Sequence, residues 1–78
     1  MRIHIHSLEK TLYEGEGSVV SLPAEEGEIS VLNNHIPLVT SLAKGIVRVR
    51  EDEIRSKEFS ITGGFAQVNK DHIIVLLN

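Results

Sequence analysis

The fold of this chain is constrained most by a series of short runs in which apolar residues recur with a period of two. Gly, Pro or Asn separates these runs every few residues. In residues 46–50, for example, Val47 and Val49 alternate with Arg48 and Arg50. A period of two places alternate side chains on opposite faces of a β-strand. No window of about 11 residues or more keeps the apolar stripe of period 3.6 that an amphipathic helix shows. The pattern therefore predicts strands and almost no helix.

The strands are expected near residues 2–6, 18–22, 28–32, 38–42, 46–50, 58–62, 65–68 and 72–77, with a further short strand over 11–15. Pro23 is expected to close the second of these runs, because proline donates no hydrogen bond to a sheet. About eight to ten short strands at this spacing are typical of a β-sandwich or small barrel. Two packed sheets are needed to bury apolar runs of this kind. We predict an all-β fold, a two-sheet β-sandwich, with residues 1–78 as one domain.

Length and charge exclude several classes of function. The chain has 78 residues, enough for one domain, and it contains no cysteine for a disulfide or a thiolate metal site. Its formal charge is −3 with both signs interspersed, which argues against nucleic-acid binding. The longest apolar run, Ile73 to Leu77, is too short to cross a bilayer. We expect a soluble, unexported chain with no direct bilayer insertion.

His4 and His6 stand two apart on the first expected strand, so both rings project from one face. This spacing chelates metals in other proteins, but a metal site also needs a third ligand, which His72 could supply only by chance of packing. The upstream Gly and the Glu spacing of the cupin motif are absent. We interpret the pair as a solvated outer face without a metal. A free-standing metal- or carbohydrate-binding β-module and a minimal cupin-type enzyme remain the alternatives.

Glu25, Glu26 and Glu28 form an acidic turn near Gly27. Catalysis by paired carboxylates requires a cleft that perturbs their pKa values, and a turn is expected to face solvent. A partner-contact loop is the better interpretation, because exposed loops on a rigid scaffold often bind.

Two further turn motifs offer no catalytic chemistry. His35 follows the turn formers Asn33 and Asn34, and no nucleophile stands nearby in a recognisable setting. The pair Gly63-Gly64 lacks the spacing of a phosphate-binding loop and predicts a bend between two strands. We therefore expect no active site and no cofactor.

Three segments in order resemble one known family, the ATP synthase epsilon subunits. They are the stretch from Leu22 to Leu38 with its His-x-Pro-Leu turn, the following Gly-led strand from Gly45, and the Gly-Gly-Phe motif at residues 63–65. The aromatic-x-Gly at Tyr13 to Gly15 matches as well. The resemblance covers essentially the whole chain. The family commonly has Pro-Gly where this chain has Asn33-Asn34.

The resemblance implies the N-terminal β-sandwich domain of a non-catalytic central-stalk subunit. Such a domain couples the gamma subunit to the membrane c-ring during proton- or sodium-driven ATP synthesis. It lies at the periphery of the membrane, on the cytoplasmic face of the bacterial inner membrane or its organellar equivalent. By the same resemblance, Glu28 and His35 are expected to contact the c-ring. The inhibitory C-terminal helical hairpin of the family has no counterpart within these residues, so its role is not implied.

Overall fold

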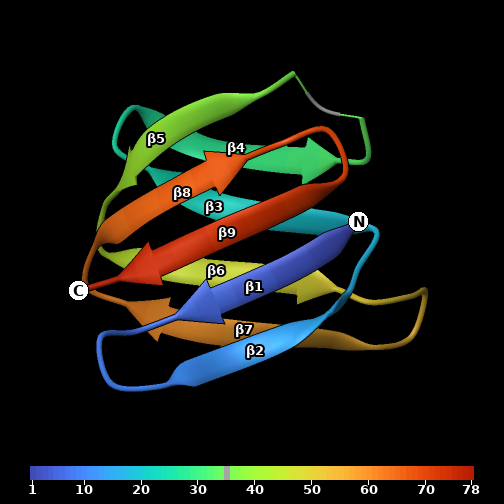
Figure 1. The fold of residues 1–78 in the computed structure, drawn as a ribbon, viewed down its shortest axis with the longest axis horizontal. Helices are drawn as coiled ribbons and strands as arrows, with labels where there is room; N and C mark the ends of the chain where they lie inside the picture. Colours follow the sequence, from blue (N-terminus) through green and yellow to red (C-terminus); the bar gives the residue numbers. More distant parts are fainter. Residues whose placement is uncertain (35) are drawn as a thin grey trace.

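The computed structural model describes residues 1–34 and 36–78, which form nine strands and no helix (Figure 1). The strands are β1 (Arg2–His6), β2 (Thr11–Glu16), β3 (Val19–Ala24), β4 (Gly27–Leu32), β5 (Leu38–Leu42), β6 (Gly45–Arg50), β7 (Ser56–Ile61), β8 (Gly64–Val68) and β9 (His72–Leu77). The all-β prediction is confirmed. Among the described residues there is also no helix that could span a membrane.

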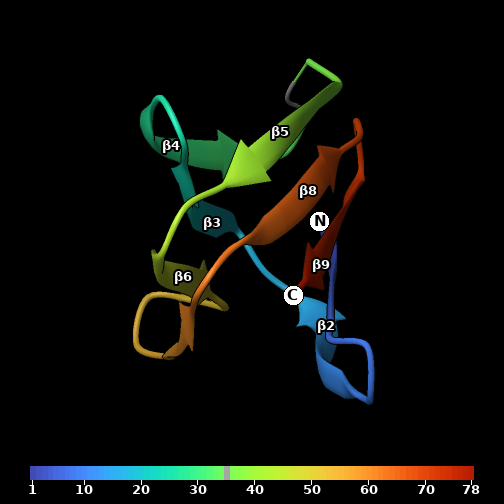
Figure 2. The same cartoon turned by 90° about the vertical axis from the view of Figure 1, so that its left-hand side faces the viewer.

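The strands form one continuous hydrogen-bonded sheet that folds over into two layers. Its order is β2-β1-β9-β8-β5-β3-β6-β7, with β4 on the other side of β3. Figure 2 shows β3, β4 and β6 on one side of the molecule and β2, β8 and β9 on the other. A single register pair, Ala24 with Leu42, connects β3 to β5 where one layer passes into the other. The predicted sandwich is thus present, built from one folded sheet rather than two separate ones.

The core lies between the layers and follows from the period-two pattern of the sequence. On β6, Val47 and Val49 are buried while Arg48 and Arg50 are exposed. A fully buried aliphatic side chain contributes about 1.5–3 kcal/mol relative to an exposed one. The larger members with less than 2% exposure are Ile3, Ile5, Val68, Ile73 and Val75 from one layer, and Val20, Leu22, Val31, Val47 and Val49 from the other.

The two end strands of the sheet, β2 and β7, face each other from opposite layers, along a seam that no backbone hydrogen bonds close (Figure 2). Side chains bridge this seam instead. The ring of Tyr13 on β2 makes an edge contact with the ring of Phe59 on β7, with centroids 5.8 Å apart. The Tyr13 hydroxyl donates a hydrogen bond to the carboxylate of Glu51. Burial, reinforced by this carboxylate, raises the pKa of Tyr13 to about 12.

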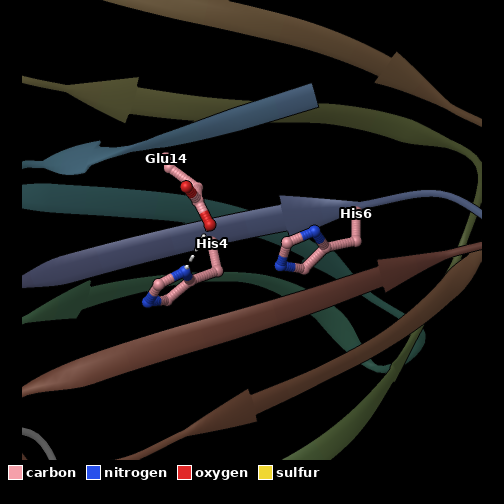
Figure 3. A group of neighbouring side chains, drawn as sticks. All are labelled: His4, His6 and Glu14. Carbon is pink, nitrogen blue, oxygen red and sulfur yellow. Dashed lines mark hydrogen bonds and ion pairs between the residues drawn. The ribbon is translucent and has the colours of Figure 1, made fainter. Parts of the chain in front are cut away.

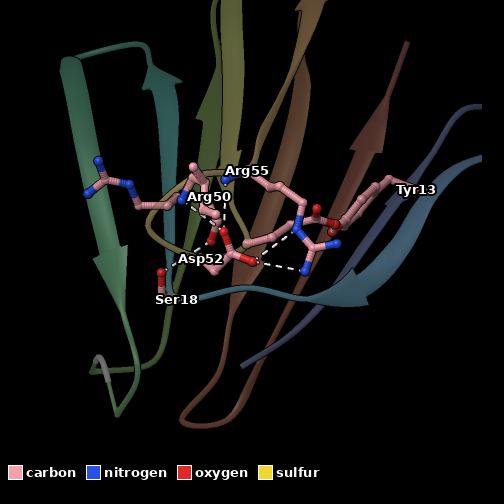
Figure 4. A network of polar contacts seen from close by, with 7 residues as sticks. Tyr13, Ser18, Arg50, Asp52 and Arg55 are labelled. Carbon is pink, nitrogen blue, oxygen red and sulfur yellow. Dashed lines mark hydrogen bonds and ion pairs between the residues drawn. The ribbon is translucent and has the colours of Figure 1, made fainter.

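The β6–β7 loop next to the seam is ordered by Asp52 (Figure 4). Its carboxylate accepts hydrogen bonds from the backbone N–H groups of Ile54 and Arg55, at 2.9 and 2.8 Å, and pairs with the Arg55 guanidinium at 2.8 Å. The two backbone donors and the guanidinium lower the pKa of Asp52. These contacts fix the short loop that presents Glu51 to Tyr13.

Two expectations about individual strands differ from the structure. Pro23 lies inside β3 and pairs with Glu28, whereas the sequence pattern had placed it at the strand end. A proline is tolerated there because its carbonyl still accepts a hydrogen bond, from the N–H of Ala43 at 2.8 Å. The seventh strand begins at Ser56 rather than Glu58, because pairing with β6 extends to Arg50.

The predicted turn at Asn33-Asn34 is confirmed by the positive φ of Asn34, 62°.

Candidate partner-contact site

Glu25, Glu26 and Glu28, called here the acidic end, lie where β3 turns into β4 (Figure 1). All three are exposed. The turn is short, because Ala24 already pairs with Gly27, whose φ of +135° is one that glycine adopts readily. The N–H of Glu25 donates to the carbonyl of Ser41 at 3.1 Å and ties the turn to β5. The fold thus presents these carboxylates on a rigid hairpin, as the sequence predicted.

A groove of about 650 Å³ runs beside the acidic end, between β4 and β5. It exists because β4 pairs with β3 alone among the described strands, so the other edge of β4 faces the groove. Ile29, Leu38 and Val39 give it an apolar lining, and Glu25 and Glu26 give it an acidic rim. An unpaired strand edge beside apolar side chains is a surface that another chain can cover.

Glu28 projects from the outer face of its layer, within electrostatic range of Arg48 on β6. The Arg48 guanidinium bonds the carboxylate of Glu58 at 2.7 Å. This bond is the main reason why the pKa of Arg48 is raised, and the more distant charge of Glu28 adds to it. Since Arg48 is already paired, Glu28 keeps its carboxylate available to a basic group of a partner.

The second residue expected at the c-ring contact, His35, lies outside the described residues. Its neighbour Asn34 donates its N–H to the carbonyl of Lys70 at 2.9 Å, so this part of the loop lies against the β8–β9 turn. Glu28 stands at the start of β4, and Asn34 follows the opposite end of that strand. The structure therefore does not bring Glu28 and Asn34 together.

The outer face of β5, β8 and β9 carries exposed apolar side chains, which the sequence pattern did not indicate. It exposes Val39, Phe65 and Leu76, with relative exposures of 71%, 56% and 54%. Phe65 pairs directly with Leu76 across β8 and β9, and Val39 lies on the adjacent strand β5. These three residues, called here the apolar face, share the outer face with Gln67 and Ser41, which pair with Val39 and Phe65. Exposed apolar areas of this kind typically mark a protein contact.

Side chains that could hold a metal gather elsewhere. Among the described residues, one group of three has its ligand atoms close enough together: His4, His6 and Glu14, on β1 and β2. His72, the third ligand considered from the sequence, has other partners. Its ring nitrogens contact Asp71 at 2.8 Å and Asn69 at 3.0 Å.

Comparison with known proteins places the fold in a family. Residues 1–78 match the family described as "ATP synthase, Delta/Epsilon chain, beta-sandwich domain". The chain belongs to this family. The match covers every strand, the acidic end and the apolar face, and it confirms the resemblance seen in the sequence.

Relatives of this delta/epsilon domain are named ATP synthase epsilon chain. The one from Nostoc sp. (strain PCC 7120) is 33% identical over 79 residues, covering 100% of this chain and 58% of the relative. The one from Prochlorococcus marinus (strain MIT 9301) is 41% identical over 69 residues, covering 88% of this chain and 51% of the relative. The chain thus spans little more than half the length of these relatives.

Solved structures share the fold of the delta/epsilon domain. A chain of the Euglena gracilis mitochondrial ATP synthase, solved as an OSCP/F1/c-ring assembly, superposes with a TM-score of 0.89 and 25% identity. That match covers 96% of this chain and 48% of the other. A chain from the central stalk and c-ring of the Tetrahymena thermophila mitochondrial enzyme gives a TM-score of 0.81 at 20% identity, covering 99% and 62%. At 20% identity, the similarity to the Tetrahymena chain shows a shared fold and nothing more.

Proposed function

We propose that this chain is a non-catalytic central-stalk component of a rotary ATP synthase, joining the gamma subunit to the membrane c-ring. The observation that supports this most is the match of all 78 residues to the delta/epsilon β-sandwich family. The same match favours the stalk over a free-standing metal- or carbohydrate-binding module. In this proposal the chain lies peripherally, on the cytoplasmic face of the bacterial inner membrane or its organellar equivalent, and the chemistry of ATP synthesis belongs to other subunits.

The acidic end is the part that we assign to the c-ring. Its carboxylates are exposed at or beside a short turn, and two of them, Glu25 and Glu26, border an open groove. Charges at the rim of a contact chiefly set the rate of encounter and the register of the two partners. By family resemblance Glu28 makes this contact, and His35 is assigned to it on the same ground.

The apolar face is the part that we assign to the gamma subunit. Val39, Phe65 and Leu76 are large apolar side chains that remain exposed in the isolated domain. An aromatic side chain near the centre of an interface commonly dominates its binding energy. A stalk contact that must withstand torque needs this kind of buried apolar anchor more than a rim of charges.

Charge reversal at Glu28 tests the c-ring assignment. In the assembled synthase, Glu28→Gln should weaken coupling modestly, since an exposed ion pair contributes about 1 kcal/mol or less, roughly a fivefold effect. Glu28→Lys should cost more, because it adds repulsion from basic groups on the ring. The measurement is ATP-driven proton pumping in reconstituted membranes, compared with ATP hydrolysis by the detached soluble complex. We expect the lysine variant to lose pumping and to keep hydrolysis.

Glu53→Lys is the matched control for that experiment. Glu53 is also exposed, but it lies in the β6–β7 loop, away from the acidic end. Its reversal should leave both activities unchanged. Equal loss of pumping and hydrolysis in Glu28→Lys, or equal pumping by the two lysine variants, would remove Glu28 from the ring contact.

An aspartate in place of Phe65 tests the gamma assignment. Phe65→Asp should reduce retention of this chain on the purified gamma subunit by at least about 30-fold, the effect of losing about 2 kcal/mol at an aromatic anchor. The fold should persist, because the side chain is more than half exposed. Ile46→Asp is the control, since Ile46 is 43% exposed on the outer face of the other layer. If Ile46→Asp abolishes retention and Phe65→Asp does not, the gamma subunit binds the opposite layer.

A further inference from the structure

Two imidazoles and a carboxylate meet on the outer face of the first hairpin (Figure 3). His4 and His6 project from the same side of β1, with their rings stacked at a centroid distance of 6.0 Å and 18° between their planes. Glu14 reaches them from β2, because the antiparallel register sets it directly opposite His4. One ligand atom from each of the three residues lies within 4.8 Å of the other two.

The distances suit a zinc-sized cation. The His4 Nδ1 atom lies 3.4 Å from the Glu14 Oε1 atom. In a tetrahedral site with ligands about 2.0–2.2 Å from the metal, neighbouring ligand atoms are about 3.3–3.6 Å apart. His4 and Glu14 are thus already spaced as two ligands of one ion. The ligand atom of His6 lies within 4.8 Å of the other two.

A hydrogen bond prepares His6 for this role. Its Nδ1 lies 3.0 Å from the hydroxyl of Thr11. When Nδ1–H donates to this hydroxyl, the lone pair of Nε2 is left free for a metal. Metal-binding histidines commonly have such a partner on the other ring nitrogen, which fixes the tautomer and the ring orientation. The hairpin therefore supplies three ligands and an orienting group for one of them.

We propose that His4, His6 and Glu14 bind one divalent cation of the zinc class, with a water molecule in the remaining position. Two imidazoles with one carboxylate favour zinc or a similar transition metal over magnesium or calcium. The face is only partly buried, with the His4 side chain 28% exposed, so the ion can enter from solvent. The bound ion would cross-link edge strand β2 to β1. This site is independent of the stalk function proposed above.

The proposal revises the interpretation of His4 and His6 as a solvated face without metal. That interpretation depended on the missing cupin motif and on the lack of a third ligand other than His72. Both ring nitrogens of His72 are engaged by Asp71 and Asn69. Glu14 takes the third place instead.

Metal titration of the tag-free chain, first stripped with chelator, tests the proposal. Calorimetry with zinc chloride should give one ion per chain, and cobalt chloride should give the visible absorption of a tetrahedral cobalt centre. His4→Gln, His6→Gln and Glu14→Gln should each weaken affinity at least tenfold. Thr11→Val should weaken it about tenfold through loss of the orienting bond. His72→Gln is the matched control and should bind as the unaltered chain does.

Thermal unfolding provides a second measurement. A ligand that binds only the folded state raises the unfolding temperature, so at one zinc concentration the rise should be smaller in Glu14→Gln than in the unaltered chain. Far-ultraviolet circular dichroism without metal checks that each variant is folded. Absence of one-to-one binding would overturn the proposal. Binding of unchanged affinity in Glu14→Gln, or loss of binding in His72→Gln, would overturn it as well.

Discussion

Replacing Gly64 with alanine should destabilise the domain by more than about 3 kcal/mol. A Cβ atom there would lie 2.2 Å from the Leu76 carbonyl oxygen, and the φ of +149° is one that other residues rarely adopt. Backbone strain of this kind alone costs about 1–3 kcal/mol. The clash adds to it, since β8 is held between β5 and β9 and cannot move away. A domain of this size has a total stability of only about 4–12 kcal/mol.

Gly27→Ala is the matched control, because Gly27 also has a positive φ, +135°, but no atom within 4 Å of the added Cβ. It should show the strain without the clash. Urea unfolding followed by circular dichroism gives both free energies. The Gly64 variant should also melt at least about 12 °C below the unaltered chain, at about 4–8 °C per kcal/mol. Similar free energies of unfolding in the two variants would show that the backbone of β9 moves away from the added Cβ atom at little energetic cost.

The stability of the domain should fall between pH 10 and pH 12 because of Tyr13. Burial, with the Glu51 carboxylate, raises the pKa of the folded-state phenol from 10.0 to about 12. The unfolded chain loses this proton first, so the folded state binds more protons in this range and the free energy of unfolding declines with pH. Its contribution is complete below pH 10 and lost as the pH passes 12. At about 1.4 kcal/mol per pKa unit, the decline is at most about 2.7 kcal/mol.

This titration can be followed cleanly, since Tyr13 is the one tyrosine of the chain and there is no tryptophan. Ultraviolet absorbance of the phenolate should give a midpoint near 12 for the folded chain and near 10 in denaturant. Tyr13→Phe should lose this part of the pH dependence and keep any part due to lysines. A folded-state midpoint near 10 would mean that the hydroxyl is solvated, and that the seam between β2 and β7 is open.

Most strands could be predicted from the sequence because their burial alternates with the same period as their apolar residues. Val47 and Val49 are buried and Arg48 and Arg50 are exposed, as the pattern required. The arrangement of the strands could not be predicted in this way. The sequence pattern gives the two faces of each strand, but it does not say that β3 leaves one layer at Ala24 and meets β5 at Leu42.

The acidic end could be predicted because Gly27 and the neighbouring carboxylates indicate an exposed turn by local chemistry alone. Glu14 could not be found as a neighbour of His4. Their contact depends on the register of β1 and β2, and an irregularity between Ile5 and His6 shifts that register. Such a bulge leaves no recognisable mark in this sequence. The apolar face was missed for a similar reason, since its residues come from three strands that become neighbours only in the fold.

The parallel pair of β1 and β9 has a consequence for the order of folding. It sets Arg2 opposite His72, so β1 joins its layer through β9, the strand farthest from it along residues 1–78. On a ribosome, the hairpins β1–β2, β3–β4 and β6–β7 can form early from local contacts. The first hairpin cannot join its layer until β9 has been synthesised, because β9 lies between β1 and β8 in the sheet. Contacts between such distant positions slow folding, because the long loop must close before they stabilise anything.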